Sequence, residues 1–104
     1  MSPLGLLATK YLAFRERGGG DFFASHDLED FITVVDGRAY IVSEINQAST
    51  DFRNYLVQGI RSLMNHEDFR EALPGYLPSD GASQGRLRIL RDKLTKIAAL
   101  SNSQ

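Results

Sequence analysis

The chain of 104 residues contains no cysteine and no tryptophan, and it has only three prolines and two histidines. Because cysteine is absent, the chain forms no disulfide and offers neither a thiol nucleophile nor a thiolate ligand. His26 and His66 are isolated in the sequence, so no metal site is predicted. No apolar run approaches the ~20 residues of a membrane-spanning helix, and no basic leader precedes the apolar N-terminal residues. These absences argue against a thiol enzyme and a membrane partner, and they favour a cytoplasmic protein.

Charge is nearly balanced, at a net value of −1, so no overall field selects nucleic acid or a membrane as partner. The two signs are nevertheless separated along the chain. Residues 21–44 contain six acids and one base, whereas residues 86–96 contain five bases and one acid. We expect two solvated faces that attract each other. The alternative is a basic strip that binds phosphates, but it lacks the interleaved aromatic residues of nucleic-acid sites, and nucleic acid is not expected as a partner of the chain alone.

Apolar residues make up 42% of the chain and are spread along it, as in a folded domain. Their spacing is helical nearly throughout. Ser2 before Pro3, Ser25 and Thr50 are residues of the type that caps a helix. The predicted fold is all-α, a compact bundle of five or six helices in one domain over residues 1–100, with a frayed tail at 101–104. Helices are expected at 3–17, 25–35, 39–46, from Thr50 onward, at 67–73 and at 84–100.

Two further segments shape the expected core. The helix after Thr50 has the cleanest amphipathic stripe, formed by Phe52, Tyr55, Leu56, Gly59, Ile60 and Leu63. Residues 74–83 are rich in proline, glycine, serine and aspartate, and they are predicted to form a surface loop.

Charged residues occur where the first two helices should be apolar. Lys10 and Arg17 are seven residues apart, so both fall within the apolar stripe of the first helix. On the second helix, Asp27 lies about a quarter turn from the centre of that helix's own apolar stripe, near enough to reach a cation on the first helix. Asp30 is expected to point further away from the stripe, on the side of Val34. His26 and Asp30 are placed to interact at i and i+4. Two interpretations remain open: a structural cluster of Lys10 and Arg17 with Asp27, or a site that binds a phosphate and its metal.

The same stretches resemble two motifs of the AbiEii-type nucleotidyltransferase-like proteins. Lys10-x-x-Ala13-Phe14-x-x-Arg17 looks like the third motif of that family, and Asp27-Leu28-Glu29-Asp30-Phe31, with its Asp-x-x-Asp spacing, looks like the fourth. The separation of the two motifs and the run from Ser25 to Asp30 are similar to those of a bacterial subgroup of the family. The resemblance is strongest over residues 8–38.

In that family the catalytic half precedes this region and holds the nucleotide and metals through a Gly-Gly motif and an Asp-x-Asp pair. This chain has no Asp-x-Asp pair, so the resemblance implies a helical C-terminal portion that is inactive alone, either truncated or one half of a split enzyme. By the resemblance, Asp27 is the catalytic acid, Lys10 and Arg17 bind the nucleotide, and His26 and Asp30 support them. No cofactor is expected for the chain alone; Mg²⁺ and a nucleoside triphosphate are implied when a catalytic half joins it.

Three apolar residues lie off the predicted stripes of the first two helices, namely Tyr11, Leu12 and Val34. Exposed apolar surface of this kind suggests a partner, either a catalytic N-terminal half or a second copy of the chain. Scattered surface hydrophobic residues are the simpler explanation. The alternative function is accordingly a self-contained helical interaction module or a homodimer, in which the charge cluster is structural.

Overall fold

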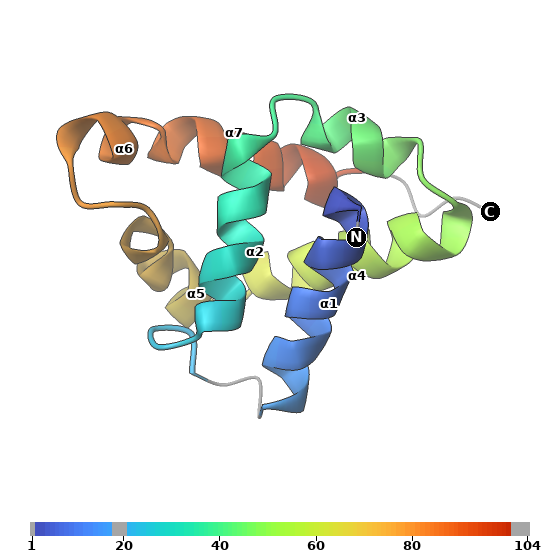
Figure 1. The fold of residues 1–104 in the computed structure, drawn as a ribbon, viewed down its shortest axis with the longest axis horizontal. Helices are drawn as coiled ribbons and strands as arrows, with labels where there is room; N and C mark the ends of the chain where they lie inside the picture. Colours follow the sequence, from blue (N-terminus) through green and yellow to red (C-terminus); the bar gives the residue numbers. More distant parts are fainter. Residues whose placement is uncertain (1, 18–20, 101–104) are drawn as a thin grey trace.

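The computed structural model describes residues 2–17 and 21–100, and within these ranges all regular structure is helical (Figure 1). The elements are α1 (Pro3–Glu16), α2 (His26–Gly37), α3 (Ile41–Asn46), α4 (Thr50–Met64), α5 (Glu67–Ala72), the 3-10 turn η1 (Leu73–Tyr76), α6 (Gly81–Gly85) and α7 (Leu87–Ala98). The predicted all-α bundle of five or six helices is confirmed by α1 to α5 and α7. The predicted frayed tail lies outside the described ranges. No helix within them is long and apolar enough to cross a membrane.

Serine side chains start the two helices that build the charged site. Ser2 Oγ and Ser25 Oγ each accept a hydrogen bond from the amide three residues later, at 3.0 and 3.1 Å. Each bond satisfies one of the amides that a helix N-terminus leaves free, as predicted for both serines. The predicted cap of α4 is wrong by one residue. Thr50 is the first helical residue, and Ser49 occupies the cap position without a side-chain hydrogen bond.

Helices α1 and α2 lie side by side and run in opposite directions, and α4 and α7 pack against this hairpin (Figure 1). Helices α2 and α7 contribute six side chains of the core that are inaccessible to solvent, namely Leu28, Ile32, Val35, Leu90, Leu94 and Ile97. The predicted stripe of α4 is buried at Leu56, Gly59, Ile60 and Leu63, with Val57 in addition. A Cα radius of gyration of 12.9 Å is that of a compact chain of this length.

Cations from residues 86–93 hold the C-terminal end of α2. The Arg86 guanidinium contacts both carboxylate oxygens of Asp36 at 3.0–3.3 Å. The Lys93 ammonium donates to three backbone carbonyls at the end of α2, at 3.0–3.1 Å. These carbonyls have no partner within the helix and carry partial negative charge, so a cation stabilises them. The predicted attraction between the acidic and basic segments is confirmed at this junction.

The segment predicted as a surface loop, 74–83, contributes to the core. It contains most of η1 and the start of α6, and Leu73, Tyr76 and Leu77 are buried. The i, i+3, i+4 spacing of these apolar residues is a helical signal, and Pro74 and Gly75 between them obscured it. Because residues 81–85 form α6, the single helix predicted at 84–100 is divided, and α7 begins at Leu87.

The prediction that Tyr11 is exposed is wrong, since the residue is only 7% exposed. Its ring lies against Gly59 of α4 and meets the Tyr55 ring edge-on, with ring centroids 5.8 Å apart. Leu12 is 47% exposed, as predicted, whereas Val34 is partly buried and packs against the core. A glycine on α4 makes room for the tyrosine ring, so the apolar surface predicted on α1 and α2 is reduced to Leu12.

This close packing predicts that Gly59→Ala destabilises the protein. The added methyl carbon would lie 2.8 Å from a ring carbon of Tyr11. Overpacking costs about 1–3 kcal/mol, and the better helix propensity of alanine offsets up to about 1 kcal/mol of it. We expect a net loss of about 1–2 kcal/mol in urea denaturation. Gly85→Ala is the matched control and should be neutral or stabilising by up to about 1 kcal/mol, because it gains the helix propensity of alanine and a Cβ there meets nothing within 4 Å. Equal stability of the two variants would contradict the packing.

Candidate functional site

The antiparallel pairing of α1 and α2 brings two cations against two carboxylates. Lys10 Nζ lies 2.8 Å from Asp30 Oδ2 and 3.8 Å from Asp27 Oδ1, and an Arg17 guanidinium nitrogen lies 3.4 Å from Asp27 Oδ2. The predicted pairing of both cations with Asp27 is confirmed. The prediction that Asp30 points away is wrong. Residues at i and i+3 lie on the same side of a helix, so both carboxylates face α1.

Burial falls from Asp27 outward through the cluster. Asp27 is 8% exposed, the Lys10 side chain is 28% exposed, and the Arg17 side chain is 77% exposed. Lys10 lies beside the buried face of α1, and its ammonium reaches the solvent at the edge of that face, as in other long cationic side chains whose stem is buried. The placement of Arg17 inside the apolar stripe is wrong, because Arg17 follows the last helical residue as the C-cap. Its guanidinium therefore stays accessible while it touches the buried carboxylate.

Lys10 is held in its charged form. A hydrogen bond to the Asp30 carboxylate is the main cause that raises the pKa of Lys10 above its usual value. Partial desolvation opposes this shift, the charges of Asp30 and Asp27 add to it, and the charge of Arg17 lowers it. Lys10 is thus suited to bind an anion as a permanent cation and is poorly suited to act as a general base.

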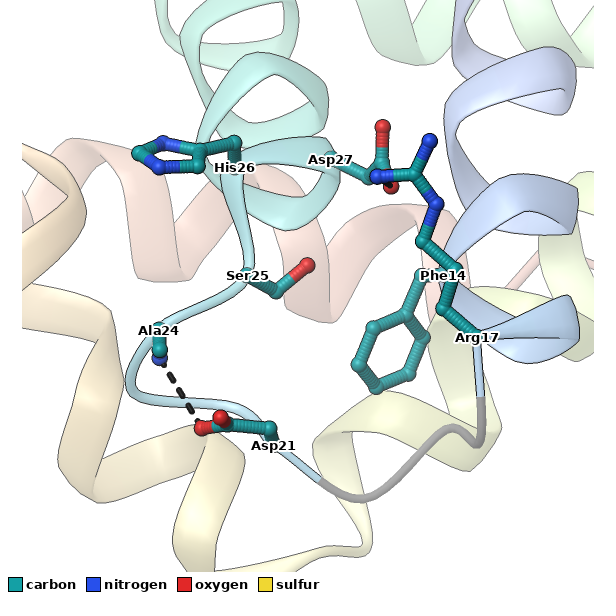
Figure 2. A pocket seen from close by; sticks show the side chains of 7 residues that line it. All are labelled: Phe14, Arg17, Asp21, Ala24, Ser25, His26 and Asp27. Carbon is teal, nitrogen blue, oxygen red and sulfur yellow. Dashed lines mark hydrogen bonds and ion pairs between the residues drawn. The ribbon is translucent and has the colours of Figure 1, made fainter.

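A pocket of about 210 Å³ opens beside the buried carboxylate. It is lined by Phe14, Arg17, Asp21, Ala24, Ser25, His26 and Asp27 (Figure 2). Arg17 and Asp27 lie together on one side of it, with the Phe14 ring below them and Asp21 across from them (Figure 2). Asp21 Oδ1 accepts a hydrogen bond from the Ala24 amide at 3.0 Å, which shapes the turn before α2. The pocket therefore offers an accessible guanidinium beside a carboxylate, over an aromatic floor.

His26 lies at the rim of this pocket, and its ring points away from the pocket (Figure 2). The predicted contact with Asp30 is not formed; His26 Nδ1 lies 3.5 Å from a Glu29 carboxylate oxygen, and the histidine side chain is 91% exposed. In the first turn of a helix, the residue at i+3 is the nearer one for this side chain. No group of three or more metal-binding side chains occurs among residues 2–17 and 21–100.

An aromatic cluster fixes the turn that lines the pocket, and the sequence patterns did not reveal it. The Phe22 ring is buried, with ring centroids 5.2 Å from Phe14 and 5.0 Å from His66. The Tyr76 hydroxyl donates a hydrogen bond of 2.6 Å to the Phe22 carbonyl, across 54 positions of sequence. Phe22 follows a glycine run and Tyr76 follows Pro74-Gly75, so both lie in segments that composition assigns to loops. The pair ties the turn to the bundle.

The hydrogen bond from Tyr76 predicts a loss of stability at high pH. Burial raises the pKa of Tyr76 to about 12, and the nearby charge of Asp21 adds to the shift. An unfolded tyrosine titrates near pH 10. Below that pH the Tyr76 hydroxyl keeps its proton in both the folded and the unfolded protein, and its full contribution to the free energy of unfolding is present. As the pH rises from about 10 towards 12, the unfolded state releases its proton more readily and stability falls.

Urea denaturation between pH 9 and about 12, followed by circular dichroism, measures this fall. Tyr76→Phe should make the fall shallower, although Lys10, whose pKa is also raised, still loses its stabilising charge at high pH. The variant should also lower stability at neutral pH by about 1–2 kcal/mol, because the buried Phe22 carbonyl loses its donor. Tyr40→Phe is the control, because Tyr40 is exposed and no partner for its hydroxyl occurs in the described part of the chain. A Tyr76→Phe variant that keeps the steep alkaline loss would contradict this role.

Comparison with known proteins adds no family to this description. No family model, no curated protein and no solved structure matches the chain. The functional conclusion therefore depends on the geometry of the charged cluster and its pocket, and on the sequence motifs that they contain.

Proposed function

We propose that this chain is the helical portion of a nucleotidyltransferase-like protein and forms one wall of a nucleotide site that a second, catalytic part completes. The observation that supports this most is Asp27. Its carboxylate is nearly buried, lies between two cations from a neighbouring helix, and borders an open pocket. The residues concerned are those that carry the resemblance, Lys10, Arg17, Asp27 and Asp30. Two motifs separated by a turn thus converge on one cluster.

Each residue has a role that follows from its surroundings. Lys10, kept protonated by Asp30, supplies a fixed positive charge for nucleotide phosphates. Among the residues that the structure describes, Arg17 makes one loose ion pair, at 3.4 Å, so most of its donors face no described partner and suit phosphate oxygens. Asp27 is the acidic residue that contacts Arg17, and it would therefore lie beside a phosphate bound by that arginine. His26 stands at the rim of the pocket, in the supporting position that the resemblance implies.

The described side chains do not by themselves fit a Mg²⁺ site. Asp27 and Asp30 are the two carboxylates of the cluster, and both are already paired with Lys10 or Arg17. Magnesium needs oxygen ligands whose negative charge is not neutralised by neighbouring cations. The metal ligands would therefore have to come from the Asp-x-Asp pair of the catalytic part. That part is the partner implied here, and it would approach from the open side of the pocket.

The alternative function is a self-contained helical interaction module or a homodimer. In that case the cluster serves only to join α1 to α2, and the short contact between Lys10 and Asp30 favours such a role. The exposed Leu12 on α1 would be the remaining apolar contact for a second copy. One exposed leucine on α1 is a small anchor, because stable interfaces bury several such side chains. The other large apolar residues that are exposed, Phe23, Tyr40 and Ile89, lie outside α1 and α2.

The two functions predict different costs for removing the Asp27 charge. If Asp27 is a site residue, Asp27→Asn should lower stability by less than about 1 kcal/mol, because the exposed Arg17 regains water and Lys10 keeps Asp30 as a partner. If it is a structural clamp, the loss should reach about 3 kcal/mol or more. Asp36→Asn is the matched control, since Asp36 is similarly buried and contacts Arg86 at 3.0–3.3 Å.

We expect Asp36→Asn to be the more destabilising of the two substitutions. Chemical denaturation of both variants, under identical conditions, makes the comparison. An Asp27→Asn loss as large as that of Asp36→Asn would favour the interaction module.

The proposal also predicts that the chain alone transfers no nucleotide, because it has no Asp-x-Asp pair. Purified protein is incubated with labelled nucleoside triphosphates, Mg²⁺ and mixed RNA and protein acceptors. No label should reach any acceptor above the level of an Asp27→Ala control. Robust transfer by the wild-type chain that disappears in Asp27→Ala would overturn the proposal of an incomplete site.

A further inference from the structure

The outer face of α7 holds cations that the fold does not use. Of the five bases between 86 and 96, three are engaged: Arg86 with Asp36, Lys93 with carbonyls of α2, and Lys96 with Asp92. The other two, Arg88 and Arg91, are exposed and have no partner among the residues that the structure describes. They are three positions apart and therefore neighbours on the helix surface, with about 5–6 Å between their Cβ atoms.

These two arginines border a shallow depression of about 670 Å³. Its lining also includes Gly85, Ile89, Asp92 and Thr95. Ile89 is 58% exposed, which is unusual for an isoleucine, and it adds an apolar surface between charged groups. The charge of Asp92 is offset by Lys96, at 3.0 Å, so the depression has a net positive character.

The chemistry of this surface favours carboxylates over nucleic acid. A guanidinium binds a carboxylate through two parallel hydrogen bonds, and arginine is enriched among the residues that dominate protein interfaces. No aromatic side chain lines the depression, so bases of a single strand would have nothing to stack on. The net charge of −1 on the whole chain also disfavours a long polyanion. Ile89 would meet an aliphatic side chain beside the acids.

We propose that the outer face of α7, centred on Arg88, Ile89 and Arg91, binds an acidic peptide segment of a partner protein that carries an aliphatic residue next to its carboxylates. Two acids one turn apart on a partner helix have the spacing of the two arginines. Helix α7 contacts the C-terminal end of α2 through Lys93, whereas Asp27 lies in the first turn of α2, at the other end of that helix. Binding here is therefore independent of the nucleotide site.

A displayed library of random peptides, about 15 residues long, tests this proposal when selected on the wild-type chain. Enriched peptides should be acidic and contain an aliphatic residue. In fluorescence anisotropy, Arg88→Glu/Arg91→Glu should raise the dissociation constant of a selected peptide by about tenfold or more, and Ile89→Ser should raise it severalfold. Arg15→Gln is the control and should change binding by less than about twofold, since it removes one positive charge from α1, outside the depression.

The charge-reversed variant should fold normally, because neither arginine contacts another described side chain; circular dichroism and a urea melt check this. The proposal is overturned if no acidic peptides are enriched or if the selected peptides bind Arg88→Glu/Arg91→Glu as tightly as the wild type. Tighter, Arg88-dependent binding of an oligothymidylate than of any selected peptide would also overturn it, in favour of a phosphate ligand.

Discussion

The burial of one carboxylate, that of Asp27, sets the arrangement of the first half of the molecule. A charge that is 8% exposed must be paired, because an unpaired buried charge is far more costly than a paired one. The only cations within 4 Å of it come from α1 and its C-cap, among the described residues. Pairing therefore decides which charged groups meet where the end of α1 lies against the start of α2, and buried apolar residues of both helices hold the two together. The same contact places an exposed arginine beside the pocket, and the Lys10 charge lies 3.8 Å from the Asp27 carboxylate that lines it.

The rest of the fold supports α2 from both ends. At its N-terminal end, the buried Phe22 ring and the hydrogen bond from Tyr76 hold the turn that leads into the helix. At its C-terminal end, Lys93 and Arg86 bind the last carbonyls and Asp36. Its apolar face packs on α7 between these two anchors. The acidic residues of α2 are thus presented by a helix with little freedom to shift, which suits a site that depends on charge geometry.

Local chemistry made much of this fold predictable, and tertiary packing explains what the sequence missed. Helical periodicity and the serine caps located α1, α2 and the core face of α4. The seven-residue spacing of Lys10 and Arg17 predicted that both cations pair with Asp27. Tyr11 was missed because its burial depends on a glycine in another helix. Asp30 was missed because the angle between α1 and α2 decides which acid meets Lys10. The contact between Phe22 and Tyr76 was missed because the two residues lie 54 positions apart, in segments with loop composition.

Lys10, Arg17 and Asp27 should respond to a nucleotide if they form part of its site, and titration of the ¹⁵N-labelled chain with ATP and Mg²⁺ measures this response. NMR shifts should move at Arg17 and at the amides of 25–27, with a dissociation constant of about 1 mM, as for an incomplete site. AMP should have less effect than ATP, and Arg17→Ala should remove the response. Unchanged spectra at the cluster, or shifts only on other helices, would contradict the account and leave a small helical domain whose charges join α1 to α2.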